Sequence, residues 1–422
     1  MAVTVTAGMG VRALLANRRY ALYLLSRVGL IVAAQMLSVA VGWQVYAITG
    51  KALALGLSGL ALFLPGFLLA LPGGHVADRR DRRRILIVCH LGFALSAAAL
   101  AILSYSGERR LWPIYAVLVT LGAIRAFSGS ASQALMPTLV DKTELERAVA
   151  LGSSCWQLAM IAGPSLGGVL YAATGKASVV YAVCAVMAII ACVSVLAIGH
   201  DPARSAPRPS GPATLGTVLA GIRYVWKNRP ILGAISLDLF AVLLGGAVAL
   251  LPIFARDILH VGPWGLGLLR SAPAIGAATT ALVLAWFPLR RRAGVTMLAA
   301  VFLFGLATIV FGLSRSFAVS LVALLSLGAF DMFSVVVRST LIQIRTPDEM
   351  RGRVGAVNMV FIGASNELGE FESGVTAAWL GPELAVLVGG VGTCIVVLLW
   401  AGLFPQLRKV DRLVEEGALI DP

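Results

Sequence analysis

Ionisable side chains interrupt long apolar stretches of this sequence, and the cost of placing a charge in lipid makes such residues functional candidates. The basic members of this set are Arg27, Arg125, Arg270 and Arg338, and the acidic members are Asp238, Asp331, Glu367, Glu370 and Glu372. Arginine keeps its charge and stabilises the ionised form of a neighbouring carboxylate. A carboxylate that alternates between water and a low-dielectric interior would bind and release a proton, and this is the chemistry that the set predicts.

Two of these residues, Arg27 and Asp238, occupy matching places in the sequence. Each follows an Asn-Arg pair, at 17–18 or at 228–229, with the same spacing. Opposite charges at matching places predict a gate pair or a clamp for a bound solute. The alternative is a static ion pair that only fixes helix packing.

A second acidic cluster lies in the glycine-rich stretch 363–374. Glu367 and Glu370 are about one helical turn apart and share a helix face, whereas Glu372 points elsewhere. Glycines can unwind a membrane helix at a binding site, so we expect Glu367 and Glu370 to bind a cation, carry protons or meet a cationic solute. For Glu372 the sequence leaves both a functional role and a position at the membrane edge open.

The elements that must hold these residues are membrane-spanning helices. The chain has 422 residues, of which 59% are hydrophobic and 13% are charged, and its mean hydropathy is +0.90. In lipid the backbone of such a stretch satisfies its own hydrogen bonds only as a helix. About twelve stretches reach the length of about 20 apolar residues that spans a bilayer, which predicts an all-α polytopic membrane protein with twelve transmembrane helices.

The distribution of basic residues predicts the orientation of these helices. The formal net charge is +14. If both termini are cytoplasmic, the basic residues of the opposite loops are Lys51, Arg109, Arg110, Lys176, Arg256 and Arg315, and most of the others face the cytoplasm. This asymmetry follows the positive-inside rule. The basic excess therefore faces anionic membrane lipid, which we expect as a partner, and it argues against nucleic acid.

The sequence divides into two related halves. Residues 1–199 predict one six-helix bundle, residues 231–422 predict a second bundle with a cytoplasmic tail, and the polar stretch 200–230 predicts a cytoplasmic linker with an amphipathic helix near 214–228. Arginine runs at 82–84 and 290–292, and charged loops at 141–147 and 346–353, repeat at nearly the same interval as the Asn-Arg pairs. Such duplication predicts a substrate site near the membrane midplane, between the halves.

The loop GGHVADRRDRRRIL at 73–86 resembles the signature loop of the major facilitator superfamily, G-x-x-x-D-R-x-G-R-R/K. The matching residues are Gly74, Asp78, Arg79, Arg82 and Arg83, and Asp81 stands where the superfamily prefers glycine. The resemblance implies a latch that closes the cytoplasmic face and opens when the halves move. The alternative is that the arginines only anchor the loop at the membrane surface.

Two further stretches resemble superfamily motifs. LGAIRAFSG at 121–129 places Arg125 at the position that the superfamily links to proton coupling, with Ser128 in place of glutamine. AGPSLGG at 162–168 resembles the helix-bending motif of its antiporters and supplies Gly163, Pro164, Gly167 and Gly168. The resemblance implies two pseudo-symmetric six-helix bundles. For Arg125 a purely structural charge is the alternative, and Asp331 lies near the equivalent point of the other half.

Residues 43–50 and 346–353 resemble the enterobactin-exporter-like and macrolide-efflux-like branch. That resemblance implies a secondary active transporter of the bacterial inner membrane that exports an amphiphilic organic solute by alternating access. Protons are the expected coupling ion, although another cation fits as well, and siderophore, macrolide and general drug export all fit. We expect a monomer.

A membrane enzyme or a receptor without a transport cycle is the alternative to transport. The sequence contains no phosphate-binding loop and no metalloprotease or serine-hydrolase motif. Its histidines are scattered and its cysteines lie inside predicted spans, so we expect no cofactor, no metal and no catalytic residues.

Overall fold

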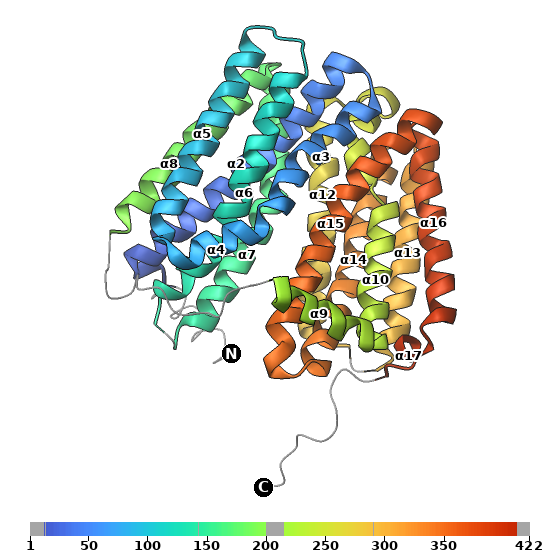
Figure 1. The fold of residues 1–422 in the computed structure, drawn as a ribbon. Coiled ribbons are helices and arrows are strands. Elements are labelled where there is room, and N and C mark those ends of the chain that lie inside the picture. The colour runs from blue at the N-terminus through green and yellow to red at the C-terminus, as the bar shows by residue number, and fades with distance from the viewer. Residues whose placement is uncertain (1–11, 13, 142, 200–214, 290, 412–422) are drawn as a thin grey trace. The chain divides into compact units, whose positions relative to one another are not determined.

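The structure, a computed structural model, describes residues 12, 14–141, 143–199, 215–289 and 291–411. All regular elements in these ranges are helices, as Figure 1 shows. The all-α prediction is therefore confirmed. Residues 200–214, which begin the predicted linker, lie outside the described ranges.

The helices of the first half follow one another closely along the chain. They are α2 (Arg18–Thr49), α3 (Ala52–Leu68), α4 (Ala70–Arg79), α5 (Arg82–Tyr105), α6 (Trp112–Leu135), the 3-10 turn η1 (Met136–Thr138), α7 (Leu145–Thr174) and α8 (Ala177–Ala197).

The second half repeats this order after one additional helix. It contains α9 (Leu215–Lys227), α10 (Arg229–Leu244), η2 (Ala247–Leu250), α11 (Leu251–Ile253), η3 (Phe254–Ile258), α12 (Gly262–Trp286), α13 (Ala293–Leu313), α14 (Phe317–Arg345), α15 (Asp348–Leu380), α16 (Pro382–Leu403) and α17 (Pro405–Arg408).

Within the described residues, nine helices are long and apolar enough to cross a membrane, and α3 is a shorter apolar helix. The helices α7 and α15 have 30 and 33 residues but are not among the nine. Both carry glycines and polar or charged residues along their length. The count of twelve transmembrane helices stays a prediction.

The chain forms two compact units, which we call unit 1 and unit 2. Unit 1 comprises Met1–Gly50, Ala61–Pro212 and Gly262–Ser271, and unit 2 comprises Lys51–Leu60, Ala213–Val261 and Ala272–Pro422. The start of α3 therefore packs within unit 2, and the start of α12 packs within unit 1. The domain boundaries expected from the sequence remain a prediction.

The repeated Asn-Arg pair has a structural explanation. The side chain of Asn17 accepts hydrogen bonds from the backbone N–H groups of Arg19 and Tyr20, at 3.1 and 3.3 Å, and so caps α2. Asn228 caps α10 in the same way, accepting from the N–H of Ile231 at 3.5 Å. Asparagine at this position satisfies N–H groups that a helix start leaves unpaired, so the repeat marks two equivalent helix starts.

Two helices are interrupted at proline and glycine. Between α3 and α4 the helix breaks at Leu69, because Pro72 has no N–H and its ring crowds the carbonyl of Leu68. In unit 2, α10 ends before Gly245 and Gly246, and the chain continues through η2, α11 and the π-helical turn η3. The expected unwinding at 363–374 does not occur, because α15 runs unbroken through that stretch.

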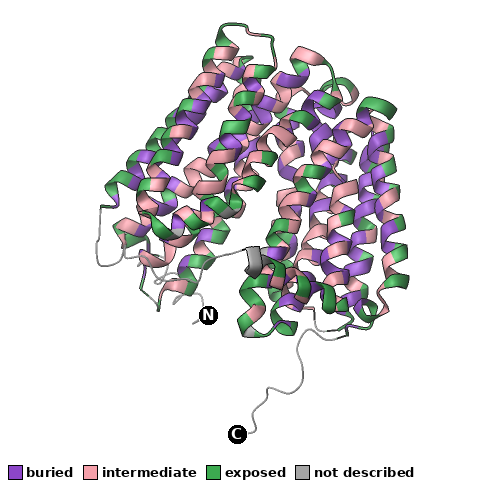
Figure 2. Cartoon of the chain, in the orientation of Figure 1, coloured by how far each residue is buried: buried purple, intermediate pink, exposed green. Residues whose placement is uncertain are grey.

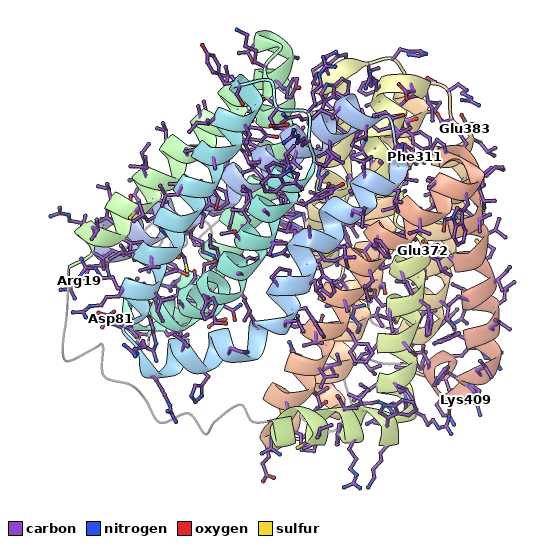
Figure 3. All side chains as sticks on the ribbon, turned by 45° about the horizontal axis from the view of Figure 1, so that its top comes forward. Arg19, Asp81, Phe311, Glu372, Glu383 and Lys409 are labelled. Carbon is purple, nitrogen blue, oxygen red and sulfur yellow. The ribbon has the colours of Figure 1, made fainter. Side chains whose placement is uncertain are left out.

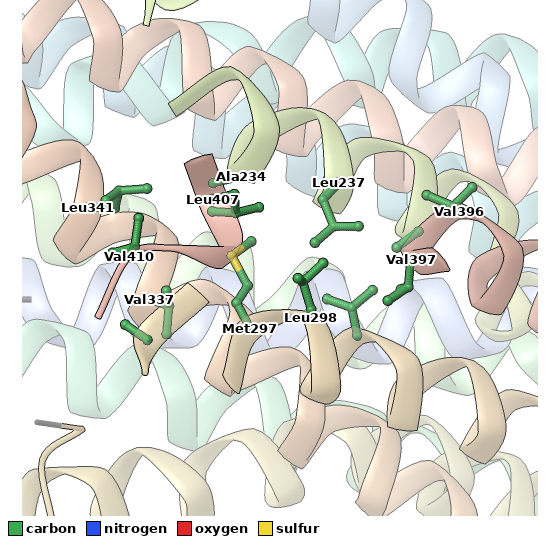
Figure 4. Packing of buried hydrophobic residues seen from close by; sticks show 13 residues of the cluster. Ala234, Leu237, Met297, Leu298, Val337, Leu341, Val396, Val397, Leu407 and Val410 are labelled. Atoms are coloured by element: carbon green, nitrogen blue, oxygen red, sulfur yellow. The ribbon is translucent and has the colours of Figure 1, made fainter. Parts of the chain in front are cut away.

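Each unit has its own apolar core. In unit 1, Tyr20, Tyr23, Leu86 and Val195 join α2, α5 and α8 in one buried cluster. In unit 2 a buried cluster joins α10, α13, α14, α16 and α17, as Figure 4 shows around Leu237 and Met297. Figure 2 shows buried and exposed residues alternating along the same helices.

The amphipathic helix expected near 214–228 is present as α9. Its apolar face packs in unit 2, where Val225 is buried in a cluster with Ile231 and Val357. The hydroxyl of Tyr224 donates to the carbonyl of Arg345 at 2.8 Å, and Trp226 is exposed. One face of α9 therefore packs against other helices of unit 2, whereas the face that carries Trp226 is exposed.

Candidate charged sites in the membrane helices

The most deeply buried charges lie in unit 2, where Asp238 of α10 forms an ion pair with Arg338 of α14. The two side chains are only 7% and 3% exposed. The hydroxyl of Ser334, also on α14, donates to Oδ1 of Asp238 at 3.4 Å. The pair is thus formed between two helices and is supported by a third polar group.

A second carboxylate, that of half-buried Asp331, lies beside this pair and interacts electrostatically with both of its members. On α14 the residues Asp331, Ser334 and Arg338 are spaced so that they share one helix face. The cluster thus holds two carboxylates and one guanidinium, and one added proton would neutralise it. This is chemistry suited to binding and releasing a proton.

The sequence identified Asp238, Asp331 and Arg338 as functional candidates but did not pair Asp238 with Arg338, and it did not identify Ser334. The spacing of Asp331, Ser334 and Arg338 along one helix face was the available signal. In the structure Arg338 is an ionic partner of Asp238, and the gate pair or clamp expected of Arg27 and Asp238 stays a prediction. A residue of an adjacent helix in the same unit supplies the counter-charge.

Arg27 is half-buried on α2 in unit 1. A Cβ added to Gly152 of α7 would lie 3.6 Å from a terminal nitrogen of Arg27 and 3.9 Å from the hydroxyl of Tyr20. That hydroxyl donates to the carbonyl of Ala148 at 2.7 Å. The guanidinium therefore lies over a bare glycine of α7, next to a tyrosine whose hydrogen bond is already made.

The acidic stretch of α15 uses its glycines for packing. A Cβ on Gly59 of α3 would lie 3.0 Å from Oε2 of Glu370, so this carboxylate covers the α3 backbone within unit 2. Gly369 packs against the carbonyls of α10, where an added Cβ would lie 2.9 Å from the oxygen of Val242. Glu367 and Glu370 are both half-buried and both have partners in the protein.

Glu372, labelled in Figure 3, accepts a hydrogen bond from the hydroxyl of Thr376 at 2.7 Å on the same helix. This local bond accounts for its half-buried carboxylate without any ligand.

Arg125 is exposed on α6, where it has a partner in the protein. The helix α4 approaches α6 closely at this level, since a Cβ on Gly73 would lie 2.9 Å from the carbonyl oxygen of Ala126. Nothing lies within 4 Å of a Cβ on Gly74. Of these two glycines, only Gly73 makes the close approach between α4 and α6.

Arginines of the 73–86 loop bind the ends of neighbouring helices. Nε of Arg83 donates to the carbonyl of Val195 at 2.9 Å and its terminal nitrogen to that of Leu196, at the end of α8. Arg82 donates to the carbonyl of Ala134 on α6 at 3.3 Å. A cation is favoured at a helix C-terminus by the unpaired carbonyls and by the helix dipole, so these arginines fasten α5 to its neighbours.

The remaining residues of this loop have separate roles. Asp81, labelled in Figure 3, caps α5 by accepting from the N–H of Arg83 at 2.9 Å. Capping by aspartate explains why this position does not need the glycine that the superfamily prefers. Arg79 is exposed in the last turn of α4, and the side chain of Asp78 lies outside the described part of the structure.

The AGPSLGG stretch of α7 is a contact surface for two helices of unit 1. A Cβ on Gly167 would lie 2.8 Å from the Cα of Met36 on α2, and one on Gly163 would meet the side chain of Gln35. On another side, a Cβ on Gly168 would lie 2.9 Å from the Cα of Gly267 on α12. Each of these contacts requires glycine.

A hydroxyl group of α12 forms hydrogen bonds with α7 close to Pro164. The hydroxyl of Ser271 on α12 donates to the carbonyl of Ile161 at 2.7 Å, one turn before Pro164, and Ser165 lies 2.8 Å from the same hydroxyl. The Ser271 hydroxyl also lies 2.9 Å from the carbonyl of Gly267 on its own helix, so it links α12 to the proline-containing turn of α7.

Unit 2 contains a matching crossing. A Cβ on Gly374 of α15 would lie 2.7 Å from the Cα of Gly56 on α3. The starts of α3 and α12, which join the unit built mainly from the other half of the sequence, are therefore each held by a glycine–glycine contact.

The sequence of this chain is related to known proteins over most of its length. A sequence profile of the family described as transmembrane secretion effector matches residues 18–417. The chain is 28% identical to the enterobactin exporter EntS of Citrobacter koseri over 380 residues, which is 90% of each chain. It is 26% identical to EntS of Shigella boydii over 379 residues, again 90% of each chain.

Solved structures share the fold at low sequence identity. The nucleoside transporter NupG matches with a TM-score of 0.70 at 14% identity, covering 92% of this chain and 99% of NupG. A bacterial homologue of the iron transporter ferroportin matches with a TM-score of 0.70 at 16% identity, covering 93% and 99%. These likenesses confirm the fold that the sequence motifs implied.

Proposed function

We propose, from the premise that this chain belongs to the transmembrane secretion effector family of the major facilitator superfamily, that it exports an amphiphilic organic solute in exchange for protons. Its place in the enterobactin-exporter-like branch, predicted from the sequence, is confirmed by the relatives. The chain is thus a multi-pass membrane exporter that carries a small-molecule substrate. The coupling ion and the mechanism are our proposal.

The cluster of Asp238, Asp331 and Arg338 carries the proposal of proton coupling. Arg338 balances one carboxylate, and a proton on the other would complete the neutralisation of the cluster. A neutral cluster is cheaper to enclose in a low-dielectric interior than a charged one. Protonation therefore favours a state in which the cluster is sealed from water, and deprotonation favours a state in which it is hydrated.

Alternating access is the proposed transport cycle. The glycine crossings of α7 with α12 and of α15 with α3 support it, because contacts between bare backbones lack interlocking side chains and can part without repacking. We propose that the arginine loop at 82–84 holds the helix ends together during this motion. Asp78 and Arg79 remain candidates for a cytoplasmic latch, and Arg125 remains a candidate for coupling.

The proposed setting is the bacterial inner membrane, with both termini cytoplasmic and the protein acting as a monomer. The relatives are named as enterobactin exporters, so a siderophore or a drug-like solute is the proposed cargo. The charge asymmetry of the loops supports this orientation.

Proton flux in vesicles tests the proposal. The purified protein is reconstituted into liposomes that enclose a pH-sensitive dye, and fluorescein or rhodamine 6G is added as an amphiphilic probe. We expect at least one probe to drive proton movement in the wild type, and Asp331→Asn to abolish that movement. Glu349→Gln, which alters an exposed carboxylate at the start of α15, is the matched control and should behave as the wild type.

Two results would count against the proposal. Transport of a probe without any proton movement would contradict proton coupling but would still support export. Consumption of a probe without its movement across the membrane would favour a membrane enzyme.

A further inference from the structure

Arg27 lies in unit 1 at a depth where a charge needs compensation. It follows Arg18, the first residue of α2, by nine positions, which places it about 14 Å along the helix axis. Its side chain is half-buried against α7. A guanidinium in such a place is costly unless a negative group meets it.

The acidic residues of unit 1 that the structure describes lie at helix ends or between helices. The acidic residues of the sequence up to 199 are Asp78, Asp81, Glu108, Asp141, Glu144 and Glu146. They lie in turns, in the last turn of α4 or in the first turn of α7. The segment 262–271, which completes unit 1, contains no acidic residue but adds Arg270, which is also half-buried.

Asp238, the carboxylate that matches Arg27 in sequence position, already has an ion-pair partner. Asp238 forms its ion pair with Arg338 inside unit 2, where Asp331 adds a further negative charge. Within the described residues, the interiors of the unit 1 helices therefore contain Arg27, Arg125 and Arg270 but no acid, whereas the interiors of the unit 2 helices contain more acids than cations.

The surroundings of Arg27 leave its guanidinium accessible to a ligand. Gly152 contributes no side chain over it, although a Cβ at 3.6 Å would fit without strain. The hydroxyl of Tyr20 is committed to the carbonyl of Ala148. The planar guanidinium, with its paired N–H donors, matches the geometry of a carboxylate or phenolate.

We propose that Arg27 binds an anionic group of the exported solute, so that the substrate class is an amphiphilic organic anion. This inference rests on the proposed function, since it names the substrate of the same transporter. It assigns the two units separate tasks: unit 1 recognises the negative charge of the solute, and unit 2 carries the protons.

Binding of two dyes with the same ring system and opposite charges tests the proposal. Fluorescein is anionic and rhodamine 6G is cationic, and fluorescence anisotropy reports their binding to the full chain in phosphatidylcholine nanodiscs. We expect the wild type to prefer fluorescein, and Arg27→Gln to weaken fluorescein binding at least tenfold without changing rhodamine 6G binding. Arg27→Lys should restore part of the affinity because it keeps the charge.

A second pair of variants leaves the arginine in place. Gly152→Leu would cover the guanidinium and should weaken fluorescein binding, whereas Gly152→Ala fits the available space and should bind as the wild type. Arg109→Gln, in the exposed loop after α5, controls for loss of any positive charge. Thermal unfolding of each variant separates lost binding from a lost fold.

Several outcomes would overturn the inference. They are equal binding of both dyes by the wild type, unchanged fluorescein binding in both Arg27→Gln and Gly152→Leu, and displacement of fluorescein by phosphatidylglycerol, which would assign Arg27 to a lipid headgroup. These outcomes are distinct from failure of the proposed function. Binding that depends on Arg27 but occurs without proton flux would contradict proton coupling and leave the anion site supported. Proton flux with binding that does not depend on Arg27 would contradict the anion site and leave proton coupling supported.

Discussion

Arg338 is the residue on which the buried cluster of unit 2 depends. It pairs directly with Asp238 and interacts with Asp331, and its side chain is 3% exposed. Removing one member of a buried pair leaves an uncompensated charge, whereas removing both members can be nearly neutral. The three residues should therefore respond unequally to substitution.

The predicted ranking is that Arg338→Gln destabilises the protein more than Asp238→Asn. The first variant leaves two carboxylates facing each other without a cation, at a cost of about 3–5 kcal/mol. The second leaves Arg338 with Asp331 as its counter-charge. Thermal unfolding in detergent measures the ranking, and the double variant should unfold at a higher temperature than Arg338→Gln alone. A larger loss in Asp238→Asn would show that Asp331 does not share the charge of Arg338.

At the scale of the elements, helix ends and helix crossings are held by different devices. Side-chain caps start α2, α5 and α10, while arginines bind the last carbonyls of α6 and α8. In the second half, a residue that follows α17 binds a helix start. The carboxylate of Asp411 accepts a hydrogen bond from the N–H of Arg292, at 3.0 Å, just before α13 begins. Crossings, in contrast, depend on the absence of side chains.

Two glycines of α15 allow this dependence to be measured. A Cβ on Gly374 would lie 2.7 Å from the Cα of Gly56, so Gly374→Ala should force α15 and α3 apart, cost about 1–3 kcal/mol and reduce export. Gly363 has nothing within 4 Å of an added Cβ, so Gly363→Ala on the same helix should stabilise it slightly. Unfolding temperatures and dye export measure both variants. Equal behaviour of the two would mean that the α3–α15 contact is not tight.

At the scale of the whole molecule, the two halves share an order of helices but differ in charge. The sequence has arginine runs at 82–84 and 290–292, and the positive-inside rule predicts that both face the cytoplasm. Within the described residues, the acids of the membrane-helix interiors lie in unit 2, whereas Arg27, Arg125 and Arg270 lie in unit 1 and Arg338 lies in unit 2. The two halves thus share an order of helices and differ in the charges of their interiors.

Labelling of single cysteines tests this topology. The five native cysteines are free thiols and are first replaced by alanine. Cysteines placed at the exposed positions Arg84 and Arg291 should react with an impermeant reagent from the cytoplasmic side only, and one at Arg109 from the opposite side only. Labelling of Arg84 and Arg291 from opposite sides would contradict the duplicated topology.

Sequence by itself determined the all-helical membrane architecture, because apolar runs of spanning length have no other way to satisfy their backbone in lipid. Local motifs were also recognisable in the sequence, and the structure shows what they do: the repeated Asn-Arg pairs are helix caps, and AGPSLGG is a close-packed helix surface. Both depend only on neighbours in the chain or on the absence of side chains.

Only the tertiary structure decided which charges meet. Arg27 and Asp238 match in sequence position, yet Asp238 pairs with Arg338, because the choice of partner depends on which helices are adjacent and which faces they present. Gly369 and Gly374 pack closely against α10 and α3, and α15 runs unbroken through 363–374. Pairing and packing are contacts between residues far apart in the chain, and spacing along the sequence does not encode them.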